Sequence, residues 1–337
     1  MTATDRRGAR ALQIGIGLAI SAALVWYTFR GTDWASVWTT VRHVKLAPLL
    51  LAIVLATLPF PLRVPRWRLL LRHDDDSALA TAPLWHAIAM GFAANNVLPL
   101  RAGELLRVAA VSRLGRVSFP TALSSLAVER VLDALAVLGL MGIGLLLADF
   151  PPGTVSSAAA LTTGAVCLAA LMMAIVAAWQ RALALRLLER ILPDNAVGAK
   201  IHHFVDRLLV GVGALRSWQR SLPVIGWTLV IWLVNAAAFY VAFSAFGFNV
   251  PFSGALLLQG TLMIGIAAPQ APGYAGGFEL PIFLTLMLYG ISKDQGVAYG
   301  LTYHITTFVP ITILGAWSIV HTKFGLKAAH EVEESAT

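Results

Sequence analysis

The chain has 337 residues, of which 58% are hydrophobic and only 12% are charged, and its mean hydropathy is +0.75. Because a soluble globular domain carries about 25% charged residues, this composition excludes an ordinary water-soluble protein and indicates an integral membrane protein. The formal net charge is +8. No basic patch with interleaved aromatic residues stands apart from the apolar runs, so we expect cytoplasmic loops beside anionic lipid headgroups and no nucleic-acid partner.

The first apolar run covers residues 11–29 and predicts a membrane-spanning helix. It is longer than the core of a signal peptide, and Arg6, Arg7 and Arg10 precede it. Since basic residues flank spans on the cytoplasmic side, residues 1–10 are expected to be a cytoplasmic segment. The second run, residues 47–62, is followed by RVPRWRLLLR, whose arginines predict a second cytoplasmic loop.

Two short apolar segments follow, at residues 83–98 and 103–114. RVPRWRLLLR precedes this pair and RLGR follows it, so both ends of the pair are expected on the cytoplasmic side. The pair therefore predicts a re-entrant helical hairpin with its tip in NNVLPLRAGE.

Residues 119–147 and 154–178 predict two full spans, which cross outward and back. Residues 179–220 then predict a cytoplasmic amphipathic insertion. Its apolar residues recur at helical spacing, at Ile201, Phe204, Val205, Leu208, Val212 and Leu215. This pattern fits a surface helix on the inner leaflet and, equally, an ordinary docked helix.

Residues 222–246 predict an outward span, and residues 296–320 predict the last span, which leads to a cytoplasmic tail at 321–337. Between them, residues 252–268 and 276–290 are short and are joined by AAPQAPGYAGGFE, which is rich in proline and glycine. We predict a second re-entrant hairpin that enters from outside. Two full spans here would balance the topology as well.

The order of span, hairpin and span thus occurs twice and in opposite directions. Inverted repeats whose broken helices meet near the membrane midplane are typical of transporters. The predicted fold class is all-α: a polytopic membrane helix bundle with two re-entrant helical hairpins in an inverted repeat. It forms one transmembrane domain over residues 11–320.

Three segments carry a resemblance to a known family: NNVLPLRAGELLR, ALSSLAVERVLDAL and APQAPGYAGGFE. Together they make the chain similar to the lysylphosphatidylglycerol synthase transmembrane-region family, whose members are also described as flippase-like domain proteins. The resemblance implies a helical membrane domain that moves aminoacylated phosphatidylglycerol, or another anionic or isoprenoid-linked lipid, between leaflets. The best-known members carry a soluble aminoacyl-transferase domain after the membrane part, and we expect this polypeptide to lack it. The family often has an arginine in the last span where this chain has His304, after Tyr303.

Charged residues interrupt the apolar run at 119–147, namely Glu129, Arg130 and Asp133. A charge that faces lipid at this depth costs at least about 2.5 kcal/mol, so we expect these side chains to face the protein interior and to find partners. The predicted pairs are Arg101 or Arg107 with Glu129 or Asp133, and Arg130 with Glu104. Such a cluster can pin the first hairpin to the bundle, contact a headgroup or ion, or couple proton movement.

The tip of the first hairpin also offers a candidate anion site. Asn95 and Asn96 can cap the end of a helix or hydrogen-bond a phosphate or glycerol headgroup. Gly103 opens the returning helix, whose N-terminus presents backbone N–H groups to an anion. Arg101 beside it has the two-pronged geometry that suits phosphate.

In the outer tip, Gly273 belongs to a group of glycines that permit tight turns, and Glu279 is expected to make a structural hydrogen bond or to couple proton movement. The candidate substrate-binding residues are Asn95, Asn96, Arg101, Gly103, Glu104, Arg107, Glu129, Arg130, Asp133, Gly273, Glu279 and His304. We expect no metal and no cofactor, because no histidine or cysteine converges on the two carboxylates.

No nucleotide-binding G-x-x-x-x-G-K-[ST] loop and no G-x-S-x-G elbow occurs, which argues against an ATP-driven pump and a serine hydrolase. The leading hypothesis is a non-enzymatic inner-membrane protein, with both termini cytoplasmic, that translocates or helps to translocate a lipid with an anionic or zwitterionic headgroup. One alternative is an intramembrane enzyme on lipid-linked substrates, with Glu129 or Asp133 as general base. Another is a non-catalytic membrane partner of a separate synthase or glycosyltransferase.

Overall fold

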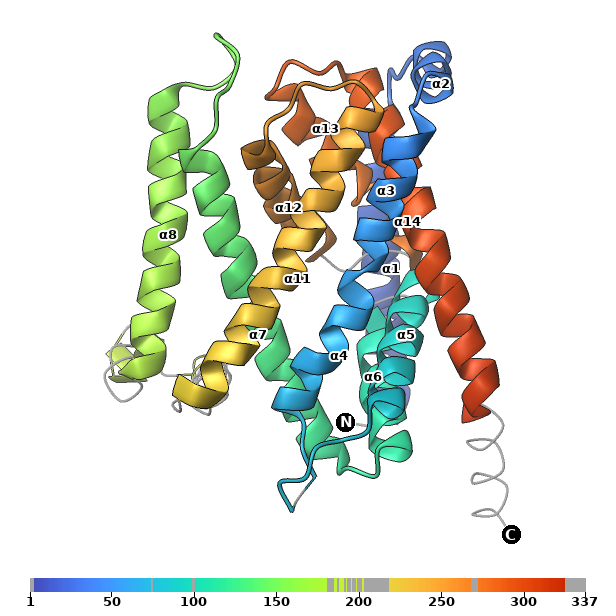
Figure 1. Cartoon of the computed structure of the whole chain (residues 1–337), viewed down its shortest axis with the longest axis vertical. Helices are drawn as coiled ribbons and strands as arrows, with labels where there is room; N and C mark the ends of the chain where they lie inside the picture. Colours follow the sequence, from blue (N-terminus) through green and yellow to red (C-terminus); the bar gives the residue numbers. More distant parts are fainter. Residues whose placement is uncertain are drawn as a thin grey trace.

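The computed structural model describes residues 3–73, 75–98, 101–180, 218–267 and 272–324, with isolated positions between 185 and 202. Within these ranges the chain is helical, and its only β contact is an isolated bridge between Arg72 and Ala78. The prediction of an all-α fold is therefore confirmed (Figure 1). Most of the predicted insertion at 179–220, and the tail from residue 325 onward, lie outside the described residues.

Helix α1 (Ala3–Phe29) is followed by the short α2 (Trp34–Arg42), which begins where the side chain of Asp33 accepts a hydrogen bond from the backbone N–H of Ala35 at 3.0 Å. This cap satisfies one of the free N–H groups of the helix end. Helix α1 starts at Ala3, eight residues before the apolar run at 11–29 that predicted it.

Helices α3 (Leu46–Thr57) and α4 (Pro59–Leu70) follow each other directly and together are long and apolar enough to cross a membrane. The apolar run predicted an end near residue 62, with the next arginines in a cytoplasmic loop. That prediction was wrong for Arg63 and Arg66, which lie inside α4 and are buried. The helix continues because these two side chains meet carboxylates in the protein interior, as described below.

Helices α5 (Thr81–Val97) and α6 (Ala102–Leu114) lie side by side, with both outer ends at the lower end of the molecule in Figure 1 and their connection at mid-height. Two glycines allow this close approach. A methyl group on Gly91 would lie 2.6 Å from Cβ of Arg107, and one on Gly103 would overlap with the backbone oxygen of Gly91.

Helix α7 (Phe119–Leu146) begins after Ser118, whose hydroxyl accepts a hydrogen bond from the backbone N–H of Thr121 at 3.2 Å. Helix α8 (Ser157–Trp179) returns beside α7, and α11 (Trp218–Ala245) runs back toward the upper end of the bundle (Figure 1). Helix α11 contains a second helical stretch long and apolar enough to cross a membrane.

A second helix pair comes from the opposite end. Helix α12 (Phe252–Ala267) descends from the upper end of the molecule in Figure 1, and the short η3 (Pro272–Tyr274) lies at mid-height before α13 (Glu279–Met287) ascends. The last helix, α14 (Lys293–Thr322), then spans the whole bundle and starts with a capping box between Ser292 and Gln295.

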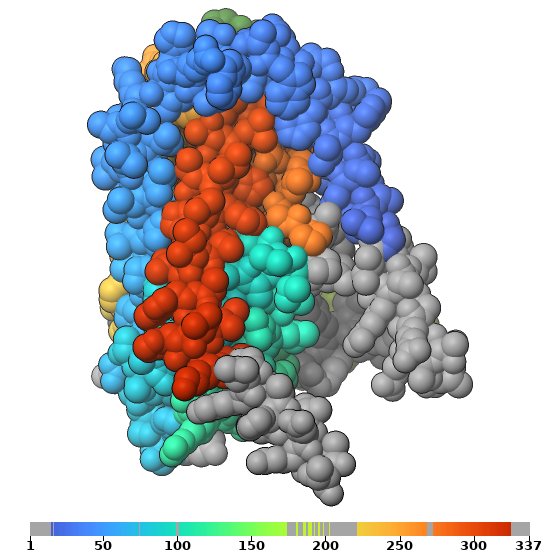
Figure 2. Space-filling view, turned by 90° about the vertical axis from the view of Figure 1, so that its right-hand side faces the viewer, coloured from blue at the N-terminus to red at the C-terminus, as the bar shows by residue number. Residues whose placement is uncertain are grey.

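The outer surface of the bundle is apolar, as lipid contact requires. Figure 2 shows α14 running down one face, beside segments of α3 and α4 on one side and the α5–α6 pair on the other. On these helices Val54, Ile313 and Val320 are exposed although they are large and apolar. Exposed apolar side chains, together with the three helices in the described residues that are long and apolar enough to span, identify an integral membrane protein.

Candidate functional site

Two buried carboxylates on α7 form the centre of the site. Glu129 and Asp133 are one helical turn apart, so they lie on the same face of the helix. Glu129 accepts two hydrogen bonds from the guanidinium of Arg107 on α6, at 2.7 and 2.9 Å. The guanidinium of Arg66 on α4 lies 3.2 Å from the same carboxylate. Of the predicted pairings of Arg101 or Arg107 with Glu129 or Asp133, the structure thus contains Arg107 with Glu129.

Asp133 accepts hydrogen bonds from three side chains on two other helices. It accepts a hydrogen bond of 2.6 Å from Nη1 of Arg66 and one of 3.3 Å from Nη1 of Arg63. The indole Nε1 of Trp232 on α11 donates to the same carboxylate at 2.9 Å. One buried aspartate on α7 is thus joined to α4 and α11, and these donors compensate the cost of burying its charge.

Arg130 links the two carboxylates of α7 to α6 of the first helix pair. Its guanidinium contacts Glu129 and lies 3.1 Å from Asp133. It also approaches Glu104 on α6 at 3.8 Å, which is the predicted pair at a long ion-pair distance. Arg101, the other predicted alternative, instead donates to the backbone oxygen of Ile266 at 2.8 Å.

Sequence reasoning missed the contributions of α4 and α11. Arg63 and Arg66 are three residues apart, a spacing that places them on one face of a helix. That spacing is the available signal, but a basic segment after an apolar run also predicts a cytoplasmic loop. Thr228, which accepts a hydrogen bond from Arg66 at 3.3 Å, carries no comparable signal in the sequence.

The charges of this cluster do not balance. Among the described residues, the cluster and the adjacent Arg101 contain five arginines and three carboxylates, which leaves a formal excess of two positive charges: Arg63, Arg66, Arg101, Arg107 and Arg130 against Glu104, Glu129 and Asp133. A positive excess is costly in a low-dielectric interior unless an anion or water compensates it.

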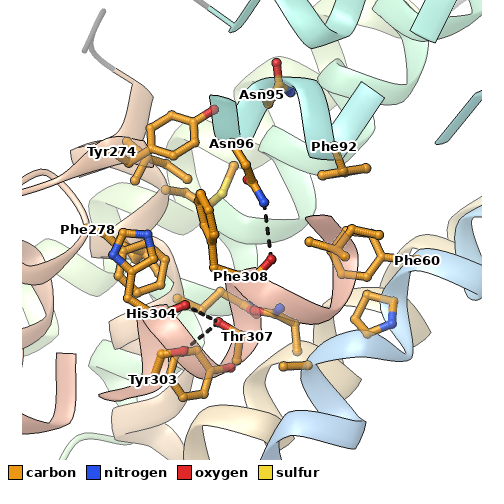
Figure 3. A pocket seen from close by; sticks show the side chains of 18 of the residues that line it. Phe60, Phe92, Asn95, Asn96, Tyr274, Phe278, Tyr303, His304, Thr307 and Phe308 are labelled. Atoms are coloured by element: carbon orange, nitrogen blue, oxygen red, sulfur yellow. Dashed lines mark hydrogen bonds between the residues drawn. The ribbon is translucent and has the colours of Figure 1, made fainter. Parts of the chain in front are cut away.

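A cavity of about 240 Å³ lies beside this cluster, where the two helix pairs meet α4, α7, α11 and α14 (Figure 3). Its polar lining residues include Arg63, Asn95, Asn96, Arg101, Glu104, Arg130, Asn235, Gln259, Tyr274, His304 and Thr307. Aromatic side chains, among them Phe60, Phe92 and Phe308, form much of the remaining wall. Pockets for amphiphilic ligands combine such apolar walls with a few convergent polar groups.

The two asparagines of the first tip have different environments. Asn96 donates to the hydroxyl of Thr312 on α14 at 2.7 Å and points toward Phe308 (Figure 3). Asn95 has a buried side-chain oxygen that has no hydrogen-bond partner among the described residues. The end of α5 is closed by the backbone N–H of Leu98, so neither described amide contact is a helix cap.

Arg101 and Gly103 have different roles in the first tip. Arg101 adopts the left-handed conformation, with φ of 54°, and directly precedes α6. Gly103 packs against α5 and is not a lining residue of the cavity. The other predicted residues that do not line the cavity are Arg107, Glu129, Asp133, Gly273 and Glu279.

The second tip reaches the first one. A methyl group on Gly273, whose φ is 77°, would lie 3.9 Å from the backbone oxygen of Asn96. Glu279 accepts a hydrogen bond from the backbone N–H of Gly276 at 2.8 Å, and Nδ1 of His304 lies 2.6 Å from its other oxygen. The imidazole of His304 stacks on Phe278 at 4.1 Å and faces the cavity.

No cluster of three or more histidine, cysteine, aspartate or glutamate side chains suited to a metal ion occurs in the described part of the chain. The polar groups around the cavity are mainly arginines, amides and hydroxyls. Arginine is the side chain that binds phosphate in a two-pronged geometry, and amides and hydroxyls bind neutral polar groups.

An integral membrane helix bundle with a charged cavity in its interior is the class of protein that this fold and site define. Residues 14–315 match the family described as Lysylphosphatidylglycerol synthase TM region, and the chain belongs to this family. The resemblance of its three motif segments predicted this assignment, which is confirmed.

Two relatives with known names are similar to the chain. It is 25% identical to Glycosyltransferase AglD of Haloferax volcanii over an alignment of 325 residues. This alignment covers 85% of this chain and 50% of the Haloferax protein. It is also 25% identical to a UPF0104 membrane protein of Methanothermobacter thermautotrophicus over an alignment of 242 residues. That alignment covers 67% of this chain and 70% of the Methanothermobacter protein. The chain thus spans half of the length of the Haloferax protein.

Proposed function

We propose that this protein translocates, or helps to translocate, a membrane lipid whose headgroup is anionic or zwitterionic. The observation that carries this proposal is the cavity between the two helix tips, with three arginines and one carboxylate in its wall. A phosphate group would compensate the positive excess that the described side chains leave. The acyl chains would stay in the surrounding lipid, beside the apolar outer surface.

The membrane placement that we propose follows from helix length. A span needs about 20 residues, whereas α5, α6, α12 and α13 have 17, 13, 16 and 9. Each pair therefore fits a re-entrant hairpin better than two spans. The pairs start from opposite ends of the bundle (Figure 1), which supports an inverted repeat.

The orientation that we propose places the lower end of Figure 1 in the cytoplasm of a cell with an inner membrane. Basic residues lie at this end, where α4, α6 and α14 finish: Arg68, Arg72, Arg113, Arg116 and Lys323. Cytoplasmic segments carry such an excess of lysine and arginine. Both termini would then be cytoplasmic.

The test is lipid movement in vesicles that contain the purified full chain and a fluorescent phosphatidylglycerol, measured by bleaching the outer leaflet with dithionite. Wild type is expected to move the lipid well above empty vesicles. Arg101→Ala is expected to lower the rate about tenfold, because a charge-assisted hydrogen bond contributes about 1.5–3 kcal/mol. Arg68→Ala is the matched control, since Arg68 is exposed at the end of α4 and does not line the cavity.

The proposal fails if wild type moves phosphatidylglycerol, aminoacylated phosphatidylglycerol and an isoprenoid-linked phosphate no faster than empty vesicles. It also fails if the vesicles move all three lipids but Arg101→Ala and Arg68→Ala have the same rates as wild type. In that case lipid movement would not depend on the cavity.

A second candidate function is that of a membrane partner for a glycosyltransferase or synthase on a separate chain. The match to the Haloferax protein, which bears the name glycosyltransferase, favours it. Sugar transfer to a lipid-linked acceptor, measured with and without the purified chain in the same vesicles, tests this candidate. A rate that does not change when the chain is added argues against it.

An intramembrane enzyme with Glu129 or Asp133 as general base has less support. A base needs access to the substrate, and neither carboxylate lines the cavity. Both are instead occupied by guanidinium groups. Product formation from labelled lipid by the purified chain alone would favour the enzyme.

A further inference from the structure

One side chain of the cavity wall is buried without any hydrogen bond. Gln259 on α12 is 1% exposed, and neither its amide nitrogen nor its amide oxygen has a partner among the described residues. It lines the cavity. Buried polar groups are nearly always hydrogen-bonded, so these atoms indicate that the cavity holds a polar occupant.

The chemistry of these atoms restricts the occupant. An amide presents a donor and an acceptor next to each other, and a hydroxyl group is the partner that can both accept and donate. A phosphate oxygen can satisfy only the donor, and an ammonium group can satisfy only the acceptor. The side chain of Gln259 is therefore suited to a headgroup that carries hydroxyls.

The charge of the wall points the same way. Arg63, Arg101 and Arg130 line the cavity, whereas Glu104 is the one carboxylate among the described lining residues. Glu104 already approaches Arg130 at 3.8 Å. Behind the wall, Glu129 and Asp133 offset part of this charge, but the five arginines and three carboxylates together keep a formal positive excess. This excess attracts phosphate and repels a headgroup that carries its own ammonium group.

We propose that the preferred ligand is a phospholipid whose phosphate bears an uncharged polyhydroxyl group, such as glycerol, inositol or a sugar. The arginines bind the phosphate, and the amide of Gln259 binds a hydroxyl. An aminoacylated, cationic headgroup binds less well. This inference rests on the proposed function, because it assigns a ligand class to the same cavity.

The test measures binding of four short-chain lipids to the purified full chain in detergent. All four have dihexanoyl chains, and their headgroups differ: phosphatidic acid, phosphatidylglycerol, phosphatidylinositol and lysyl-phosphatidylglycerol. Trp232, which lines the cavity, provides a fluorescence signal. We expect phosphatidylglycerol and phosphatidylinositol to bind about fivefold or more tightly than phosphatidic acid and lysyl-phosphatidylglycerol, because each hydroxyl adds a hydrogen bond.

The variants Gln259→Leu and Gln259→Met remove the amide and keep the volume nearly constant. Both are expected to lose the preference for phosphatidylglycerol over phosphatidic acid while they bind phosphatidic acid as wild type does. Their melting temperatures should not fall, since the lost amide has no partner in the protein. Gln180→Leu is the control, because Gln180 is exposed and lies outside the cavity.

The inference is overturned if lysyl-phosphatidylglycerol binds as tightly as phosphatidylglycerol. It is also overturned if both Gln259 variants keep the wild-type preference. These outcomes leave the proposed function standing. If none of the four lipids binds to wild type, the proposed function fails together with the inference.

Discussion

Arg107 and Glu129 form a two-pronged ion pair, with both guanidinium Nη atoms donating to the two carboxylate oxygens at 2.7 and 2.9 Å. The guanidinium also lies 3.9 Å from the ring centre of Trp67, which is itself buried. This geometry fixes α6 against α4 and α7. The first helix pair is therefore attached to the bundle by a charged contact rather than by apolar packing alone.

Glu129→Gln is expected to destabilise the protein by about 3–5 kcal/mol, because it leaves buried guanidinium groups without their counter-charge. Arg107→Lys should also lower stability, since an ammonium group cannot form two parallel hydrogen bonds. Thermal unfolding of the purified variants in detergent measures both effects. An unfolding temperature equal to that of wild type for both variants would show that the pair does not hold the hairpin.

Arg66→Ala and Arg68→Ala compare a buried arginine and an exposed arginine on the same helix. Arg66 is 0% exposed and contacts both Glu129 and Asp133. Its removal should cost about 3–5 kcal/mol, whereas removal of Arg68 should change stability by less than about 0.5 kcal/mol. The two melting temperatures give the result directly. Similar losses for the two variants would contradict the buried ion cluster.

Part of this cluster could be predicted from the sequence, and the reason for the remainder is physical. Charges within a long apolar run must find partners, which was enough to predict that Arg101 or Arg107 pairs with Glu129 or Asp133, and Arg130 with Glu104. The sequence did not decide between Arg101 and Arg107. The rule that assigns basic segments to cytoplasmic loops counts charges but does not say which way a side chain points. It therefore misplaced Arg63, which faces inward from α4.

The ends of the second helix pair show the same limit. The apolar segment 276–290 predicted a helix, but α13 begins only at Glu279. The side chain of this glutamate accepts a hydrogen bond from the backbone N–H of Gly276, and φ of that glycine is 78°. Hydrophobic periodicity does not register such a local contact, so it predicts the element and misses its boundary.

Gly103→Ala tests the close approach of α5 and α6. The added methyl group would overlap with the backbone oxygen of Gly91, so the helices must move apart, at a cost of about 1–3 kcal/mol. Gly226→Ala is the matched control, because no atom lies within 4 Å of the position of its methyl group. Since Gly226 lies within α11, alanine there should stabilise the helix by about 0.5–1 kcal/mol. Opposite shifts of the unfolding temperature are the expected result.

Substitutions of Glu279 test whether this residue makes a structural hydrogen bond or couples proton movement. Glu279→Gln keeps an oxygen for the N–H of Gly276 and gains an NH₂ group that can donate to Nδ1 of His304. Its stability should therefore stay within about 1 kcal/mol of wild type, whereas Glu279→Leu leaves both partners unsatisfied and should cost about 1–3 kcal/mol for each.

Lipid movement in vesicles completes the comparison for Glu279. If the glutamate is structural, Glu279→Gln moves lipid within about twofold of the wild-type rate, since the amide makes the same contacts without a titratable proton. The rate should also respond to a proton gradient as it does in wild type. A Glu279→Gln protein that is as stable as wild type but no longer moves lipid would instead assign the proton-coupling role to this residue, because only its ability to ionise has been removed.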